Sequence, residues 1–127
     1  MTPAVSKIPC EKNLAMPTLD LDSRHFRLLL ELLNLHAPEA EVWAFGSRVD
    51  GSGHAASDLD LVLRNPANLT QPQKRLAALR GALIESNLPM SVDVLDWARI
   101  PDDFRREIER QHVIVRSVAT SENIGAR

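Results

Sequence analysis

Cysteine is almost absent from this chain of 127 residues, in which Cys10 is the only one. A single cysteine excludes an internal disulfide, argues against a cysteine-based metal site and fits a reducing compartment. The chain also lacks a strong charge of one sign, because 15 basic residues face 17 acidic ones and the net charge is −2. A protein whose main role is to bind a nucleic-acid backbone needs a marked basic excess, so composition argues against that class and leaves room only for a local basic patch.

Long apolar runs are missing as well. The first 20 residues do not contain the continuous apolar core of a signal peptide. The longest apolar run elsewhere is far below the roughly 20 residues of a membrane span, and we therefore expect a cytoplasmic protein without a membrane partner. Two nucleotide-binding motifs are also absent. The sequence contains neither the Gly-Lys-Ser/Thr of a P-loop nor the Gly-X-Gly-X-X-Gly fingerprint of dinucleotide-binding proteins.

The pattern that is present predicts a single α/β domain. The first 20 residues carry three prolines and no periodicity, so we expect a flexible N-terminal arm at 1–20, a folded domain at 21–116 and a loose C-terminal tail at 117–127. Apolar periodicity predicts helices at 23–36, at 73–87 and from Pro101 onward, and strands at 41–46, 58–64, 91–97 and 112–116. This order indicates a small mixed β-sheet with helices packed on it.

Two carboxylates open the second predicted strand. Because side chains alternate along a strand, Asp58 and Asp60 point to one face and the leucines between and after them to the other. Asp93, on the third predicted strand, joins them if the two strands are neighbours. Such a cluster of like charges is unfavourable without a cation, and Mg²⁺ prefers carboxylate and phosphate oxygens. A lone Asp-X-Asp is more often a pair of solvated surface acids, so this prediction depends on Asp93.

A short glycine turn precedes the acids in the stretch FGSRVDGSGHAASDLDLVLR. Gly46 ends the first strand, and Ser47 begins a short helical turn. A glycine lets a phosphate approach the backbone, and the N–H groups at a helix start bind anions. The Ser47 hydroxyl can donate to a phosphate oxygen, and Arg48 can make paired hydrogen bonds to phosphate. The alternative is an ordinary turn in which Ser47 is the N-cap.

Together these residues resemble the minimal nucleotidyltransferase family of the DNA-polymerase-beta-like nucleotidyltransferase superfamily. The matching signature is Gly46 and Ser47, ten residues, Asp58-Leu59-Asp60, and a third aspartate on a later strand, which here is Asp93. The resemblance covers about residues 22–116. It implies the nucleotidyltransferase fold.

The resemblance also implies transfer of a nucleoside monophosphate, with AMP from ATP as the leading case, onto a hydroxyl with release of pyrophosphate. By this resemblance, Gly46, Ser47 and Arg48 bind the nucleotide, and Asp58, Asp60 and Asp93 bind Mg²⁺, expected as two ions. Asp93 would also act as the general base. One departure concerns Asp50, which stands where the family often has a basic residue and would weaken a phosphate contact made there.

Small single-domain proteins of this kind are typically encoded beside a helical HEPN protein. The resemblance therefore implies an antitoxin that attaches AMP to a tyrosine of a HEPN toxin. Three other readings stay open: transfer to a small molecule such as an aminoglycoside, a non-catalytic antitoxin that acts by binding, and nucleotide addition to RNA, which the acidic balance disfavours most. The base preference, the acceptor hydroxyl and the existence of a homo-oligomer also stay open.

Overall fold

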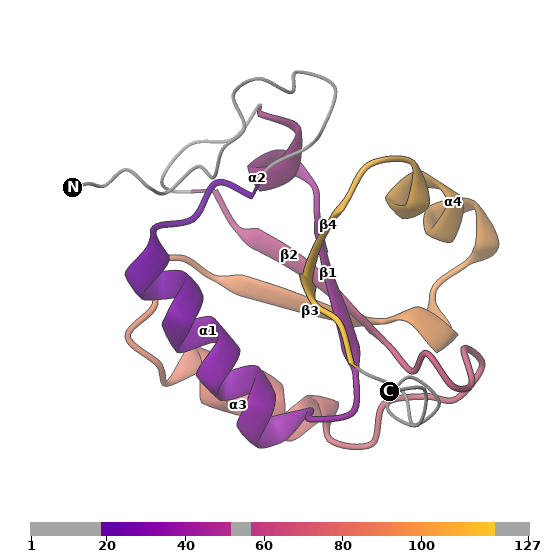
Figure 1. Cartoon of the computed structure of the whole chain (residues 1–127), viewed down its shortest axis with the longest axis horizontal. Coiled ribbons are helices and arrows are strands. Elements are labelled where there is room, and N and C mark those ends of the chain that lie inside the picture. Colours follow the sequence, from indigo (N-terminus) through magenta and orange to yellow (C-terminus); the bar gives the residue numbers. More distant parts are fainter. Residues whose placement is uncertain (1–18, 52–56, 119–127) are drawn as a thin grey trace, which may run out of the picture.

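The computed structural model describes residues 19–51 and 57–118, and within them four strands form one sheet (Figure 1). The strands are β1 (Glu41–Phe45), β2 (Leu59–Arg64), β3 (Val92–Asp96) and β4 (Val113–Arg116), and their order across the sheet is β3-β2-β1-β4. β1 is antiparallel to both β2 and β4, whereas β2 and β3 are parallel. The predicted small mixed sheet is confirmed.

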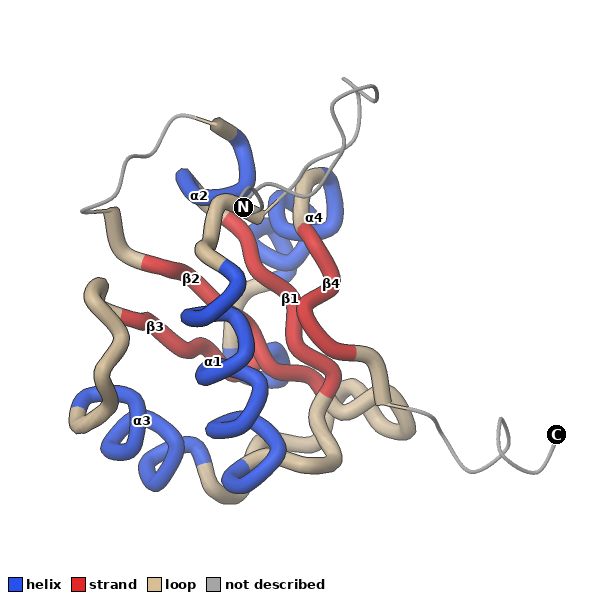
Figure 2. The backbone as a smooth tube through the Cα atoms, turned by 60° about the vertical axis from the view of Figure 1, so that its left-hand side comes forward, coloured by secondary structure: helices blue, strands red, loops and turns tan. Residues whose placement is uncertain are grey.

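Helices cover both faces of this sheet (Figure 2). α1 (Ser23–His36) and α3 (Leu76–Ile84) pack on one face and α4 (Asp102–Arg110) on the other, while α2 (Ser47–Asp50) lies at the end of β1. A short 3-10 helix, η1 (Trp97–Arg99), follows β3. Among the residues that the structure describes, none of the helices has the length and apolar character needed to cross a membrane.

Two predicted helix boundaries are corrected. The helix expected at 73–87 is shorter at both ends: Arg75 is the N-cap of α3, and the backbone N–H of Gln73, before it, donates to the Asp96 carboxylate at 2.9 Å. Glu85 is the C-cap of α3. Pro101 is the N-cap of α4, one residue outside the helix that it was expected to begin.

The alternation predicted for the second strand divides the core into two parts. Three leucines of β2 are buried against α1 and α3, together with other aliphatic residues of those helices: Leu59, Leu61, Leu63, Leu29, Leu33, Leu79 and Leu83. The opposite face holds a smaller cluster of Trp43, Val62, Trp97 and Ile108 beneath α4. The side chain of Asp60 therefore points toward the α4 face, away from the larger core.

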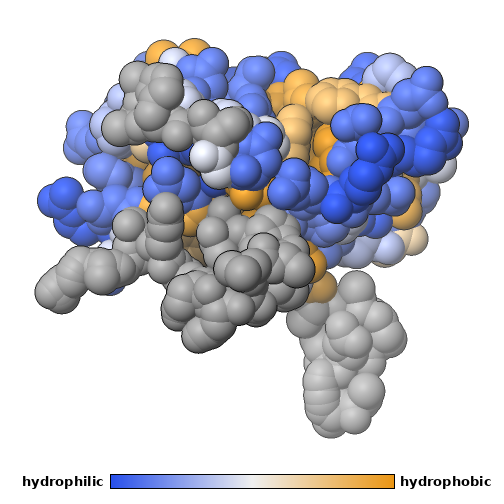
Figure 3. Space-filling model, turned by 90° about the horizontal axis from the view of Figure 1, so that it is seen from above, coloured by the Kyte–Doolittle hydropathy of each residue, from blue (hydrophilic) through white to orange (hydrophobic). Residues whose placement is uncertain are grey.

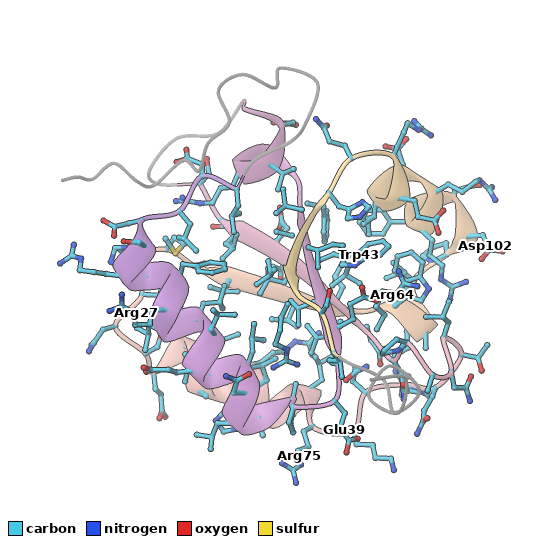
Figure 4. All side chains as sticks on the ribbon, in the orientation of Figure 1. Arg27, Glu39, Trp43, Arg64, Arg75 and Asp102 are labelled. Carbon is cyan, nitrogen blue, oxygen red and sulfur yellow. The ribbon has the colours of Figure 1, made fainter. Side chains whose placement is uncertain are left out.

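An arginine lies against two tryptophans on the α4 side of the sheet, and Figure 4 shows Arg64 next to Trp43. The Arg64 guanidinium lies 4.1 Å from the ring centroid of Trp43 and 4.6 Å from that of Trp97. The Nε of Arg105, on α4, donates to the carbonyl of Trp97 at 2.9 Å. Cation–π contacts of this kind hold a long side chain in place, so α4 has a defined position over the sheet.

The last two residues of the predicted N-terminal arm contact the rest of the domain. Leu19 is buried, and the backbone N–H of Asp20 donates to the carbonyl of Arg48 at 2.9 Å, so residues 19 and 20 belong to the folded domain. The rest of the predicted arm at 1–20, and most of the predicted tail at 117–127, lie outside the described residues.

Candidate active site

Strand register places Phe45, Asp60 and Asp93 in one row at one end of the sheet. Phe45 is opposite Asp60 in the antiparallel pair of β1 and β2, and Asp60 is opposite Asp93 in the parallel pair of β2 and β3. Side chains of register partners point to the same face, so both carboxylates face the α4 side. β2 and β3 are thus neighbours, which is the condition that the predicted cluster of three acids required.

The three acids influence one another electrostatically. Asp60 is half-buried, whereas Asp58 and Asp93 are exposed. Burial raises the pKa of the Asp60 carboxyl, and the negative charges of Asp93 and Asp58 raise it further. Within residues 19–51 and 57–118, however, no group of three acidic, histidine or cysteine side chains is arranged so that it could hold a metal ion. The acids are thus neighbours whose repulsion a cation would relieve.

Gly46 brings the predicted phosphate turn directly against the acids. It directly follows β1 and has φ +85°, and it is Gly46, not Ser47, that is the N-cap of α2. A Cβ atom at this position would collide with the Asp60 carboxylate. Ser47 begins α2 and is half-buried. The two ends of the stretch that joins Gly46 to Asp60 therefore meet in space, although residues 52–56 between them lie outside the described part.

Arg48 lies inside the fold. Its side chain is buried, with 5% of the residue exposed. Its Nε donates to the carbonyl of Ser57 at 2.9 Å, and its Nη1 donates to the carbonyl of Asp20 at 2.8 Å. Arg48 thereby connects α2 to the residue just before Asp58. These contacts give Arg48 a positioning role, and its predicted contact to the nucleotide stays a prediction.

The cavities that the structure shows lie elsewhere. Two open cavities of about 240 and 440 Å³ surround the start of α3, at the opposite end of the sheet from the acid row, and share Gln73, Lys74 and Leu76. None of the predicted site residues lines them. Asp96, which borders the larger one, acts as the capping residue that its strand-end position indicated, because its carboxylate accepts from the N–H groups of Gln73 and Ala98.

Comparison with known proteins decides the family. The profile of the family described as "Polymerase beta, Nucleotidyltransferase" matches residues 29–119. The chain belongs to this nucleotidyltransferase family. The predicted family, fold and enzyme class are therefore confirmed, and this domain of the nucleotidyltransferase spans most of the chain.

Two similar proteins refine the comparison. The nucleotidyltransferase is 39% identical over 99 residues to the "Probable protein adenylyltransferase MntA" of Haemophilus influenzae, a match that covers 76% of this chain and 83% of the relative. A solved structure described as "Crystal structure of the toxin-antitoxin with AMP-PNP" matches with a TM-score of 0.59 at 18% identity, over 77% of each chain. The second likeness supports the fold.

Two features of the site were not found from the sequence. The contact between Gly46 and Asp60 follows from the register of β1 and β2. This register could not be predicted from the sequence because the connection between the two strands is long. The burial of Arg48 follows from its bonds to Asp20 and Ser57, residues 28 and 9 positions away. The apolar residue Val49, next to Arg48 in the sequence, indicated locally that α2 packs inward, and in the structure it is buried.

Gly46→Ala should destabilise the fold more than Gly51→Ala. Both glycines have φ +85°, but a Cβ at Gly51 has no neighbour within 4 Å. We expect Gly51→Ala to cost about 1–2 kcal/mol from the left-handed backbone alone. Gly46→Ala should cost a further 1–3 kcal/mol or so for two reasons. The new methyl displaces the Asp60 carboxylate, and Gly46, with ψ −156° where Gly51 has ψ 0°, lies in a backbone region that is essentially restricted to glycine. Urea unfolding measures both, and equal losses would contradict the packing of Gly46 against Asp60.

Arg48→Lys should lower stability, because one ammonium cannot reproduce the two directed hydrogen bonds of the buried guanidinium. We expect a loss of about 1.5–3 kcal/mol in the free energy of unfolding. Arg24→Lys is the matched control, since the Arg24 side chain is 76% exposed. An Arg48→Lys variant that is as stable as wild type but binds the nucleotide more weakly would instead support the phosphate contact predicted from the sequence.

Proposed function

We propose that this nucleotidyltransferase is an Mg²⁺-dependent protein adenylyltransferase, which moves AMP from ATP onto a tyrosine hydroxyl of a HEPN-type toxin and acts as its antitoxin. The observation that carries the proposal is the meeting of Gly46 with Asp60, in register with Asp93, because it puts a phosphate-binding turn and a row of acids in one site. The 39% identity to a protein named as an adenylyltransferase supports the same activity.

The donor set fits magnesium. Asp58, Asp60 and Asp93 offer hard carboxylate oxygens, and Mg²⁺ in proteins is usually held by one or two carboxylates together with substrate phosphates. The open arrangement of the acids suits an ion that completes its shell with phosphate oxygens and water. When bound, one or two such ions would neutralise charge on the phosphates and on the departing pyrophosphate.

Residues of the chain would bind the triphosphate and accept the proton of the acceptor hydroxyl. The backbone N–H groups at the start of α2 and the Ser47 hydroxyl would hold the triphosphate. Asp93, which is exposed, would accept the proton of the attacking hydroxyl. The hydroxyl oxygen then forms a bond to the α-phosphorus, the bond from that phosphorus to the oxygen bridging to the β-phosphorus breaks, and pyrophosphate leaves with that electron pair. The proposal places this reaction in the cytoplasm, where ATP is available and the single cysteine stays reduced.

The double variant Asp58→Asn/Asp60→Asn should abolish transfer. We expect transfer to fall by at least about 100-fold, because replacing second-shell partners of metal ligands alone typically costs 10- to 100-fold. The assay incubates the protein with Mg²⁺, ATP labelled at the α-phosphate and the co-encoded partner, and mass spectrometry identifies the modified residue. Label is expected on a tyrosine, and changing that tyrosine to phenylalanine should remove it.

Asp103→Asn is the matched control, because the Asp103 side chain is 91% exposed on α4 and outside the acid row. Thermal unfolding with and without Mg²⁺ gives a second readout: the ion should raise the melting temperature of wild type and of the control but not that of the double variant. Toxin neutralisation that survives in the double variant would show a binding antitoxin, and label on an aminoglycoside instead of the partner would show a small-molecule transferase.

A further inference from the structure

An aromatic pair borders the acid row on the α4 side. Phe45, at the end of β1, and Phe104, on α4, meet edge to face with ring centroids 5.6 Å apart and planes at 85°. Both residues are half-buried. The fully buried members of the same cluster, Trp43, Val62, Trp97 and Ile108, form the packed part of the α4 interface. The phenylalanine pair is therefore at the open edge of this cluster.

Strand register places the phenylalanine pair close to the acid row. Phe45 is the antiparallel register partner of Asp60, and the Cβ atoms of such partners lie roughly 4.5–5.5 Å apart on one face. Phe45 also directly precedes Gly46, the glycine that meets the Asp60 carboxylate. An aromatic side chain thus adjoins both the phosphate turn and the central acid.

Further apolar residues extend this surface away from the acids. The next row on the same face contains Trp43, Val62 and Leu95, which are register partners across β1, β2 and β3. Leu95 and Ile100 are half-buried and, like the two phenylalanines, pack against the buried residues of this cluster. Figure 3 looks onto the end of the molecule that carries α2 and α4, and apolar surface is open there between hydrophilic regions. Charged groups on one side and an open apolar surface on the other suit a substrate with a phosphate and a flat ring.

We infer, on the basis of the proposed function, that the Phe45–Phe104 pair binds a planar aromatic ring of a substrate beside the acid row. The two rings already meet edge to face, and aromatic rings favour offset-stacked or edge-to-face contacts with a third ring. Two substrates of the proposed reaction carry such a ring: ATP through its adenine and the acceptor through its tyrosine. The experiment distinguishes these two sources.

Phe104→Leu and Phe45→Leu test this binding site, because leucine keeps apolar volume and removes the ring. The control is Phe26→Leu. Phe26 is the one phenylalanine of the chain outside the pair, and it packs against the larger core between the sheet and helices α1 and α3. Calorimetry measures the Kd of a non-hydrolysable ATP analogue with Mg²⁺ in the absence of acceptor. Steady-state transfer at saturating ATP measures KM for the acceptor, and thermal unfolding checks that each variant is folded.

A ring contact predicts a loss of about two- to twelvefold, the equivalent of one aromatic pair. The loss should appear in the Kd of the nucleotide if adenine occupies the pair, or in KM for the acceptor with kcat unchanged if the tyrosine does. Phe104→Tyr, which retains a ring, should restore the affected constant, and Phe26→Leu should change neither. Folded leucine variants with wild-type values of both constants would overturn the inference.

The two proposals fail in different ways. If wild type transfers no AMP, the proposed function is wrong, and the Kd of the ATP analogue then decides the inference alone. A wild-type Kd in both leucine variants would overturn it in that case. If wild type transfers AMP while the leucine variants match it in both constants, only the aromatic site is wrong.

Discussion

The position of the Asp60 carboxylate against the backbone of Gly46 is the constraint on which the site depends. Gly46 has no side chain, and a Cβ there would occupy the space of that carboxylate. The same aspartate is the register partner of Asp93 on β3 and of Phe45 on β1. One side chain therefore aligns the phosphate turn, the acid row and the aromatic pair, and displacing it would disturb all three.

This arrangement carries a stability cost that the other face of the sheet offsets. Burial and two neighbouring negative charges raise the pKa of Asp60, so keeping it ionised at neutral pH disfavours the folded state. Three leucines that alternate with the acids along β2 are almost completely buried against α1 and α3. The densely packed opposite face thus supplies stability away from the acids.

Much of the fold and part of the site could be predicted from the sequence because they follow from local periodicity. The alternation in DLDLVLR placed Asp60 on the face opposite the leucines, whereas Asp58 directly precedes β2, and Gly46 directly follows the end of β1. Contacts between distant residues could not be predicted. The burial of Arg48 depends on carbonyls of Asp20 and Ser57, and the pairing of Phe45 with Phe104 depends on how α4 lies over the sheet. The bond between the N–H of Gln73 and the Asp96 carboxylate, which joins residues 23 positions apart, is another contact of this kind.

The central claim is that the glycine turn and the three acids form one nucleotide site. A crystal structure of the protein with Mg²⁺ and a non-hydrolysable ATP analogue tests it most directly. We predict metal density bridging the phosphates to Asp60 and to at least one of Asp58 and Asp93, with the phosphates against Gly46 and Ser47. A triphosphate bound in the cavities around the start of α3, or metal held without Asp60, would contradict this account.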